Sequence, residues 1–186
     1  MCIALACTDF IKSKTTFSLV HAVQGLPFEV DMLMNISCDI IGQRTWLVRE
    51  ALKRGSTHIL MVDSDMFFPI EDGVNPIQRL VSHDKDIIGG WYNFRRLPAE
   101  PVGFPRELHT GETEPFKCDV VGTGFLLVKR EVFEKIPEPW FQFGRDKEQQ
   151  LVYGEDSWFC DQARKVGFDV WADPGLFIKH IGEFAY

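Results

Sequence analysis

Apolar runs and helix-like patterns alternate along most of the chain. Segments that are wholly apolar or strictly alternating predict β-strands, and segments with apolar residues three and four positions apart predict α-helices. The predicted strands cover residues 3–8, 28–34, 59–62, 86–92, 119–128 and about 168–172. The predicted helices cover residues 15–24, 40–54, 76–82 and 130–135, with a last one between Asp156 and Gly167. This alternation predicts an α/β fold with a mostly parallel sheet.

The helix predicted at 40–54 has clear end signals and one unusual residue. Asp39 is suited to cap its first turn, and Gly55 is suited to the left-handed position that follows its last turn. Arg44 falls on the apolar stripe that should face the sheet. A buried guanidinium needs an anion, and either an internal salt bridge or a ligand phosphate would satisfy it.

Two segments lack a regular pattern. Residues 97–117 are rich in proline and glycine, and we expect them to form a long flap over a site. Residues 137–153 are also expected to be irregular. After a turn at 173–175, alternation places Leu176, Ile178 and His180 on one face, which we expect to point inward.

Composition narrows the class of protein. A length of 186 residues fits one domain, taken as residues 1–186, and a net charge of −7 without a basic patch argues against a nucleic-acid partner. No apolar stretch approaches the ~20 residues of a membrane span. The five cysteines are scattered without C-x-x-C spacing, which favours neither a disulfide framework nor a zinc site and predicts a cytoplasmic setting.

The chemistry of the chain is concentrated where an apolar run ends in Asp63-Ser64-Asp65. If the strand continues through this segment, both aspartates point to the same face. Two neighbouring carboxylates repel each other and cost desolvation unless a cation lies between them. Ligands of open α/β sheets bind at the carboxyl ends of the strands. We therefore predict a divalent-metal site that holds a phosphate-bearing substrate.

A second group of chemically active side chains lies in the last third of the chain. Glu155 and Asp156 stand at the start of the last predicted helix, where acids commonly cap free amides, or where one of them could serve as a general base. His180 is either a hydrogen-bonded core residue or a metal ligand that supplements the aspartates.

The order of these segments resembles the GT-A glycosyltransferases, most closely their family 2-like group. The similar segments are residues 44–48 with 57–68, residues 121–133 with their Gly-Thr-Gly, and residues 154–180. The resemblance implies a Rossmann-related three-layer α/β/α sandwich with a mostly parallel central sheet. The chain is short for this group, and it has Thr8-Asp9-Phe10 in place of the usual proline-bearing loop after the first strand.

The resemblance also implies roles for single residues. Asp63 would lie near the ribose or the metal, Asp65 would bind the metal, and His180 would complete the protein's share of the coordination. Asp156 would be the catalytic base, with Glu155 beside it.

Further residues are implied to contact the donor. Thr8 and Asp39 would hold the nucleotide, Ser64 would lie beside it, and Arg44 would add positive charge. The implied activity is that of a hexosyltransferase using Mn²⁺ or Mg²⁺. It would move a sugar, with inversion, from a UDP- or GDP-linked donor to a hydroxyl of a saccharide, lipid or protein acceptor.

Three other classes of protein fit parts of the pattern. Haloacid-dehalogenase-like phosphatases also open their site with a strand and two aspartates, but normally near the N-terminus. Nucleotidyltransferases usually have a glycine-rich, basic loop after the first strand, which this chain lacks. A non-catalytic nucleotide- or sugar-binding module would keep Asp63 and Asp65 but would have no need of Asp156.

Overall fold

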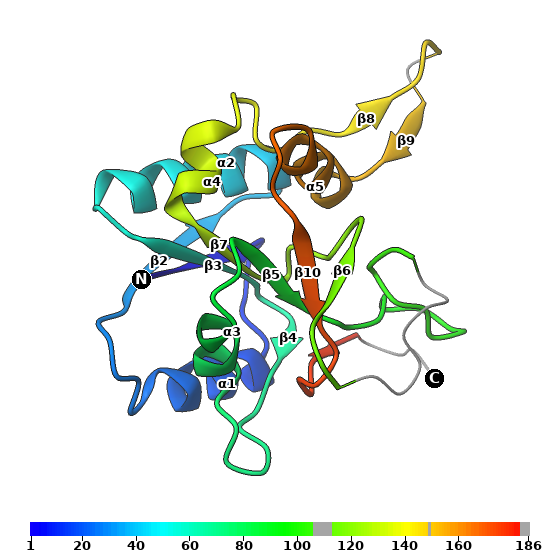
Figure 1. Cartoon of the computed structure of the whole chain (residues 1–186). Coiled ribbons are helices and arrows are strands. Elements are labelled where there is room, and N and C mark those ends of the chain that lie inside the picture. Colours follow the sequence, from blue (N-terminus) through cyan, green and yellow to red (C-terminus); the bar gives the residue numbers. More distant parts are fainter. Residues whose placement is uncertain (106–112, 149, 183–186) are drawn as a thin grey trace.

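A seven-stranded sheet forms the centre of the protein (Figure 1). The computed structural model describes residues 1–105, 113–148 and 150–182. The strands lie in the order β2 (Asp31–Ile36), β1 (Cys2–Cys7), β3 (His58–Asp63), β7 (Phe125–Lys129), β5 (Ile87–Gly90), β10 (Val170–Asp173) and β6 (Phe116–Cys118). Strands β7 and β6 are antiparallel to their neighbours, and the others run parallel to one another. The mostly parallel sheet is therefore confirmed.

Helices cover both faces of this sheet (Figure 1). One face carries α1 (Ser13–Val23) and α3 (Pro76–Ser82), and the other carries α2 (Ile40–Lys53), α4 (Arg130–Lys135) and α5 (Glu155–Lys165). All five helices lie where the sequence predicts them. The end signals of α2 are confirmed: Asp39 caps its first turn by accepting a hydrogen bond from Gly42 N, and Gly55, after its last turn, has a left-handed φ of 78°. The result is a three-layer α/β/α sandwich.

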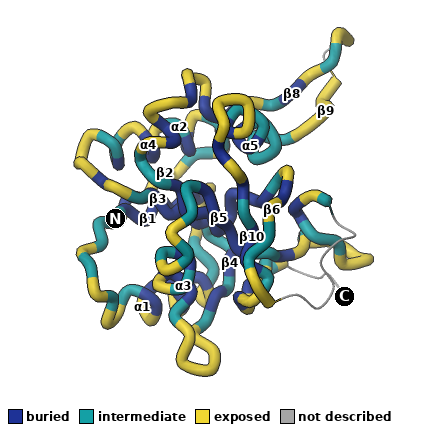
Figure 2. Tube along the Cα trace, viewed as in Figure 1, coloured by how far each residue is buried: buried dark blue, intermediate teal, exposed yellow. Residues whose placement is uncertain are grey.

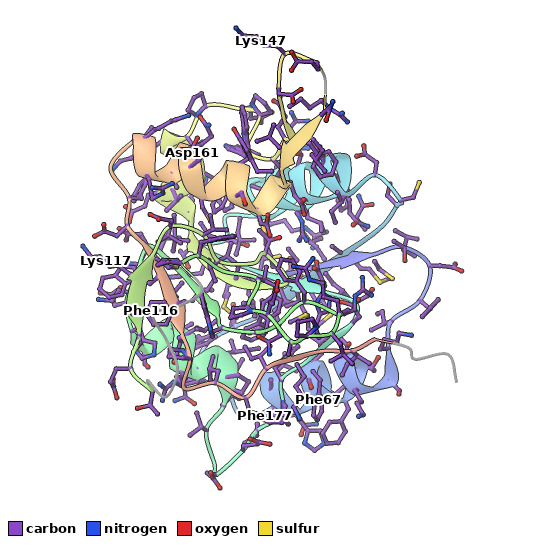
Figure 3. The ribbon with its side chains drawn as sticks, turned by 90° about the vertical axis from the view of Figure 1, so that its right-hand side faces the viewer. Phe67, Phe116, Lys117, Lys147, Asp161 and Phe177 are labelled. Atoms are coloured by element: carbon purple, nitrogen blue, oxygen red, sulfur yellow. The ribbon has the colours of Figure 1, made fainter. Side chains whose placement is uncertain are left out.

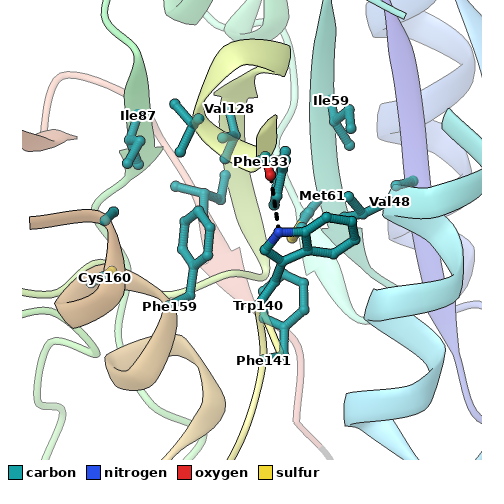
Figure 4. Close-up of a cluster of buried hydrophobic side chains, with 14 of the residues drawn as sticks. Val48, Ile59, Met61, Ile87, Val128, Phe133, Trp140, Phe141, Phe159 and Cys160 are labelled. Atoms are coloured by element: carbon teal, nitrogen blue, oxygen red, sulfur yellow. Dashed lines mark hydrogen bonds between the residues drawn. The ribbon is translucent and has the colours of Figure 1, made fainter. Parts of the chain in front are cut away.

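The central strands β1, β3, β7 and β5 are the most deeply buried part of the chain, whereas the edge strand β2 is partly exposed (Figure 2). Two apolar clusters, one on each face, pack the helices onto the sheet. In the cluster beneath α2, α4 and α5, the rings of Phe133, Trp140, Phe141 and Phe159 pack together, and the indole of Trp140 donates hydrogen bonds to Phe133 O and Ile136 O (Figure 4). This contact ties the segment after α4 to the core.

The strand expected at 119–128 is wrong in its extent. The structure has β6 at 116–118 and β7 from Phe125, with the Gly-Thr-Gly segment between them outside either strand. Gly122 and Gly124 lie against the ring of Tyr92, and a Cβ on them would come within 2.3 Å and 2.7 Å of its hydroxyl. The glycines therefore allow a close approach of side chain to backbone, which the strand pattern did not reveal.

The two segments expected to be irregular contain some regular structure. Residues 137–153 include a short hairpin, β8 (Gly144–Arg145) with β9 (Leu151–Tyr153), which projects from the body with Lys147 near its tip (Figures 1 and 3). The segment 97–117 is a loop up to residue 105 and ends in β6, while 106–112 lie outside the described residues.

A second, two-stranded sheet brings distant segments together. Strand β11 (Lys179–His180) pairs antiparallel with β4 (Met66–Phe67), and Phe177 packs edge-on against Phe67 at 6.4 Å between ring centroids (Figure 3). Leu176 and Ile178 are buried, as their alternation predicted. This pairing places His180 beside the end of β3.

The cysteines are unpaired, and most of them are buried. All five cysteines are free thiols, and burial raises the pKa of Cys2 to about 11 and that of Cys118 to about 12. These two thiols therefore stay protonated and behave as small apolar core residues. Within the described part of the chain, no helix has the length and apolar character needed to cross a membrane.

Candidate active site

The segment Asp63-Ser64-Asp65 forms a turn at the carboxyl end of β3, and its backbone is held from several directions. Asp63 is the last residue of the strand. The partners of the turn's N–H and C=O groups come from four other parts of the chain, at 2.8–3.1 Å: Ala6 O, Lys12 N with the Thr15 hydroxyl, Gly124 O and Ile181 N. Because these bonds fix the turn, the directions of its side chains are determined by the fold.

Arg44 links this turn to the start of α5. Its side chain is 4% exposed; Nη2 lies 2.9 Å from Asp63 Oδ1 and Nε lies 3.6 Å from Glu155 Oε1. Burial alone lowers the pKa of Arg44, but the charges of Asp63 and Glu155 raise it above its ordinary value. The internal salt bridge expected as one of two partners for this arginine is therefore present.

Tyr92 packs beside the turn, against the Gly-Thr-Gly segment. Its hydroxyl accepts a hydrogen bond from Gly124 N at 2.9 Å, and a Cβ on Gly124 would lie 3.0 Å from Asp63 Oδ2. Burial, and next the charge of Asp63, raise the pKa of Tyr92 well above its usual range, so the phenol stays protonated. The close spacing of Gly122 and Gly124 was the one sequence signal that a side chain packs there.

Asp65 has a different set of partners from Asp63. Its Oδ2 lies 2.6 Å from Arg95 Nη1, and its Oδ1 lies 3.3 Å from His180 Nε2. Burial raises the pKa of Asp65, but the hydrogen bond from His180 and the charges of His180 and Arg95 lower it on balance. The expectation that both aspartates share a strand face is wrong, because β3 ends at Asp63 and the turn redirects Asp65.

A cleft opens above the turn. Two cavities of about 290 Å³ and 250 Å³ share Thr8, Ser64, Asp65 and Arg95 among their lining residues. The larger also contacts Phe10, Lys12 and Ile181, and the smaller also contacts Ala6, Cys7, Ile40, Gln43, Asp63 and His180. Asp39 does not line either cavity, because its carboxylate caps α2. A cavity of about 200 Å³ at the other end of β3, beside Met1 and His58, is lined by no carboxylate.

Asp156 lies in the first turn of α5, next to the residue that Arg44 binds. Its Oδ1 accepts a hydrogen bond from Ser157 N at 2.7 Å, so it satisfies one free amide of that turn, while Gly154 is the N-cap residue. Burial, and next the charge of Glu155, raise the pKa of Asp156 above its ordinary value. A raised pKa makes the carboxylate a better proton acceptor than a solvent-exposed aspartate.

The described ranges contain no group of three or more His, Cys, Asp or Glu side chains placed to hold a metal on their own. Asp65 and His180 nevertheless fit a shared ion, because neighbouring ligands about 2.1 Å from an octahedral Mg²⁺ stand about 3 Å apart, close to the 3.3 Å found here. Mg²⁺ is commonly held by one or two carboxylates together with substrate phosphates. The metal set expected from the sequence is thus only partly assembled, with Asp63 turned to Arg44.

Charge in the site is unbalanced. Four carboxylates, those of Asp63, Asp65, Glu155 and Asp156, face two guanidinium groups, those of Arg44 and Arg95. A divalent cation bound beside Asp65 would offset part of this excess of carboxylates.

Comparison with known proteins gives a fold assignment. No protein-family model matches the sequence, and no curated protein sequence matches it. Among solved structures, the chain is similar to A197 from STIV, with 19% identity and a TM-score of 0.68 over 98% of this chain and 86% of that one. It is also similar to GalNAc-T7, crystallised with UDP, GalNAc and Mn²⁺, with 16% identity and a TM-score of 0.55 over 96% of this chain and 37% of that one. At these identities the similarity concerns the fold, which is GT-A-like, as the resemblance implied.

Proposed function

We propose that this protein is a metal-dependent glycosyltransferase that moves a sugar from a nucleoside-diphosphate donor to an acceptor hydroxyl with inversion at the anomeric carbon. The observation that carries the proposal is that Asp63, Asp65 and His180 line one cleft. Arg44, which is not part of that lining, bridges Asp63 to Glu155, the neighbour of Asp156. The GT-A-like fold, and the UDP, GalNAc and Mn²⁺ bound by GalNAc-T7, support a donor of this kind.

The lining of the cleft suits the donor's diphosphate. In this proposal Asp65 and His180 hold Mn²⁺ or Mg²⁺, while Thr8 and Ser64 face the nucleotide. When bound, such a cation stabilises the negative charge that grows on the departing phosphate oxygen. Asp63 remains oriented by Arg44, whose own charge lies next to the site of that developing charge.

Asp156 is proposed to accept the proton of the acceptor hydroxyl. The bond between the anomeric carbon and the phosphate oxygen breaks, and its electron pair leaves with the nucleoside diphosphate. The acceptor oxygen forms the new bond from the opposite side as its proton passes to the carboxylate. The raised pKa of Asp156, caused by burial and by Glu155, supports this role.

The rival activities have less support from the geometry. A phosphatase of the haloacid-dehalogenase type needs its first aspartate free to attack phosphorus, whereas Asp63 is bound to Arg44 at 2.9 Å. A non-catalytic binding module would not need the raised pKa of Asp156, which the proposed proton transfer uses.

Calorimetry with UDP and GDP tests the proposal. Binding of one of these nucleotides is expected in Mn²⁺ or Mg²⁺, and it should disappear in EDTA. The variant Asp65→Asn should lose the metal-dependent part of the affinity. Asp119→Asn, at an exposed acid that pairs with Arg164 away from the cleft, is the matched control and should bind like the wild type. Equal binding with and without metal would reject the proposed site.

A further inference from the structure

The two arginines of the site are held in very different ways. Arg44 belongs to α2, is 4% exposed and contacts two carboxylates. Arg95 lies in the loop that follows β5, and its side chain is 51% exposed while it pairs with Asp65. Only the Arg95 end of this pair is open to solvent, whereas the Asp65 side chain is 14% exposed and also faces His180. Arg95 can therefore leave Asp65 without moving a buried side chain, provided that another cation takes its place.

Arg95 stands where it would compete with the proposed metal for the carboxylate of Asp65. Its Nη1 lies 2.6 Å from Oδ2 of the same carboxylate whose Oδ1 faces His180. A guanidinium at this distance neutralises the charge that would attract a divalent ion, and it repels the ion directly. Arg95 also lines both cavities of the cleft, next to Thr8 and Ser64.

We infer that Arg95 is an exchangeable counter-ion: it neutralises Asp65 while the donor is absent, gives up this carboxylate to the divalent cation, and then binds the donor's phosphates. The inference rests on the proposed function and assigns to Arg95 a role in ordering the binding of metal and nucleotide. Its planar guanidinium matches phosphate oxygens as well as it matches carboxylate.

The surroundings of Arg95 allow this exchange. Its aliphatic stem runs beside Gly182, where an added Cβ would lie 3.7 Å from Arg95 Cβ, and the residue lines both cavities of the cleft. Lys12, on the wall of the larger cavity, adds a second positive charge to the region where the phosphates would lie. The donor's anion thus offers Arg95 a new partner within the same cleft.

The test measures Mn²⁺ affinity and nucleotide affinity separately. Free Mn²⁺ is followed by electron paramagnetic resonance in the absence of nucleotide, for the wild type, Arg95→Ala and Arg95→Gln. Arg96→Ala is the matched control, since Arg96 is an exposed neighbour that pairs with Glu100 instead of Asp65. UDP and GDP are then titrated calorimetrically at saturating Mn²⁺, and thermal melting checks that each variant is folded.

Opposite changes in the two affinities are expected. Both Arg95 variants should bind Mn²⁺ alone about five- to tenfold more tightly than the wild type, because a competing charge is gone. They should bind the nucleotide at least about tenfold more weakly, because a charge-assisted phosphate contact is gone. Arg96→Ala should match the wild type in both measurements.

Two results would overturn the inference, and they differ in meaning. Unchanged or weaker Mn²⁺ binding by both Arg95 variants, with normal metal-dependent nucleotide binding by the wild type, removes the counter-ion role and leaves the proposed function intact. If the wild type binds neither Mn²⁺ nor a nucleotide, the proposed function fails and the role of Arg95 fails with it.

Discussion

Replacing Arg44 by methionine should destabilise the protein strongly. Methionine keeps most of the aliphatic volume but leaves Asp63 and Glu155, whose side chains are 26% and 16% exposed, without their shared counter-ion. Removing one partner of a buried ion pair costs 3–5 kcal/mol, and the partial exposure of both acids argues for the lower end. With a urea m-value of about 2 kcal/mol per molar, a loss of about 3 kcal/mol lowers the unfolding midpoint by about 1.5 M.

A double variant identifies the cause of this loss. Without Arg44, the carboxylates of Asp63 and Glu155 repel each other in the folded state with no cation between them. Removing one of the two charges should therefore reduce the deficit of Arg44→Met. The double variant with Glu155→Gln should recover part of the stability at neutral pH.

A matched control is the ion pair between Arg49, on the exposed side of the same helix, and Glu138, in the segment after α4. Their side chains are 53% and 40% exposed, so Arg49→Met should cost less than about 1 kcal/mol. Urea unfolding followed by circular dichroism measures all these variants. If Arg44→Met unfolds at the same urea concentration as Arg49→Met, or if adding Glu155→Gln restores no stability, the electrostatic explanation is refuted.

Three further substitutions give distinct expected outcomes. Asp156→Asn should abolish sugar transfer while leaving nucleotide affinity intact. Because burial and Glu155 raise the folded-state pKa of this acid, its ionised form costs stability at neutral pH, and the variant should be more stable than the wild type there. This advantage should disappear below about pH 4, where the acid is protonated in both states. A less stable variant in a urea titration would instead favour the capping role. His180→Ala should weaken Mn²⁺ binding about 10- to 100-fold, and unchanged affinity in a metal titration would exclude this histidine as a ligand. Tyr92→Phe should cost about 1–3 kcal/mol, because the buried Gly124 N–H loses its acceptor; a midpoint equal to that of the wild type would show that water replaces the hydroxyl.

The parts of the fold that were predictable have local signals. Helix α2 has a capping aspartate, an apolar stripe and a closing glycine within one segment, and it forms where these signals place it. The division of residues 116–129 into β6 and β7 could not be foreseen, because it depends on Tyr92 packing onto two glycines from another part of the chain. The hairpin in 137–153 is likewise short and lacks an alternating apolar pattern.

In the candidate site too, some contacts could be predicted from local sequence signals and others could not. That Arg44 needs an anion follows from its place on an apolar stripe, and the structure supplies Asp63 and Glu155. The pairing of Asp65 with Arg95 had no sequence signal, because it depends on how the loop after β5 returns over the end of β3. Alternation along a strand fails as a guide where the strand ends and a turn begins.

Anomalous X-ray diffraction from crystals grown with UDP or GDP and Mn²⁺ tests the central claim most directly. The account predicts an anomalous peak in contact with Asp65 and His180, with the nucleotide's phosphates on its other side. A crystal that contains the nucleotide but has no anomalous peak there, with Asp65 still paired to Arg95, would contradict it.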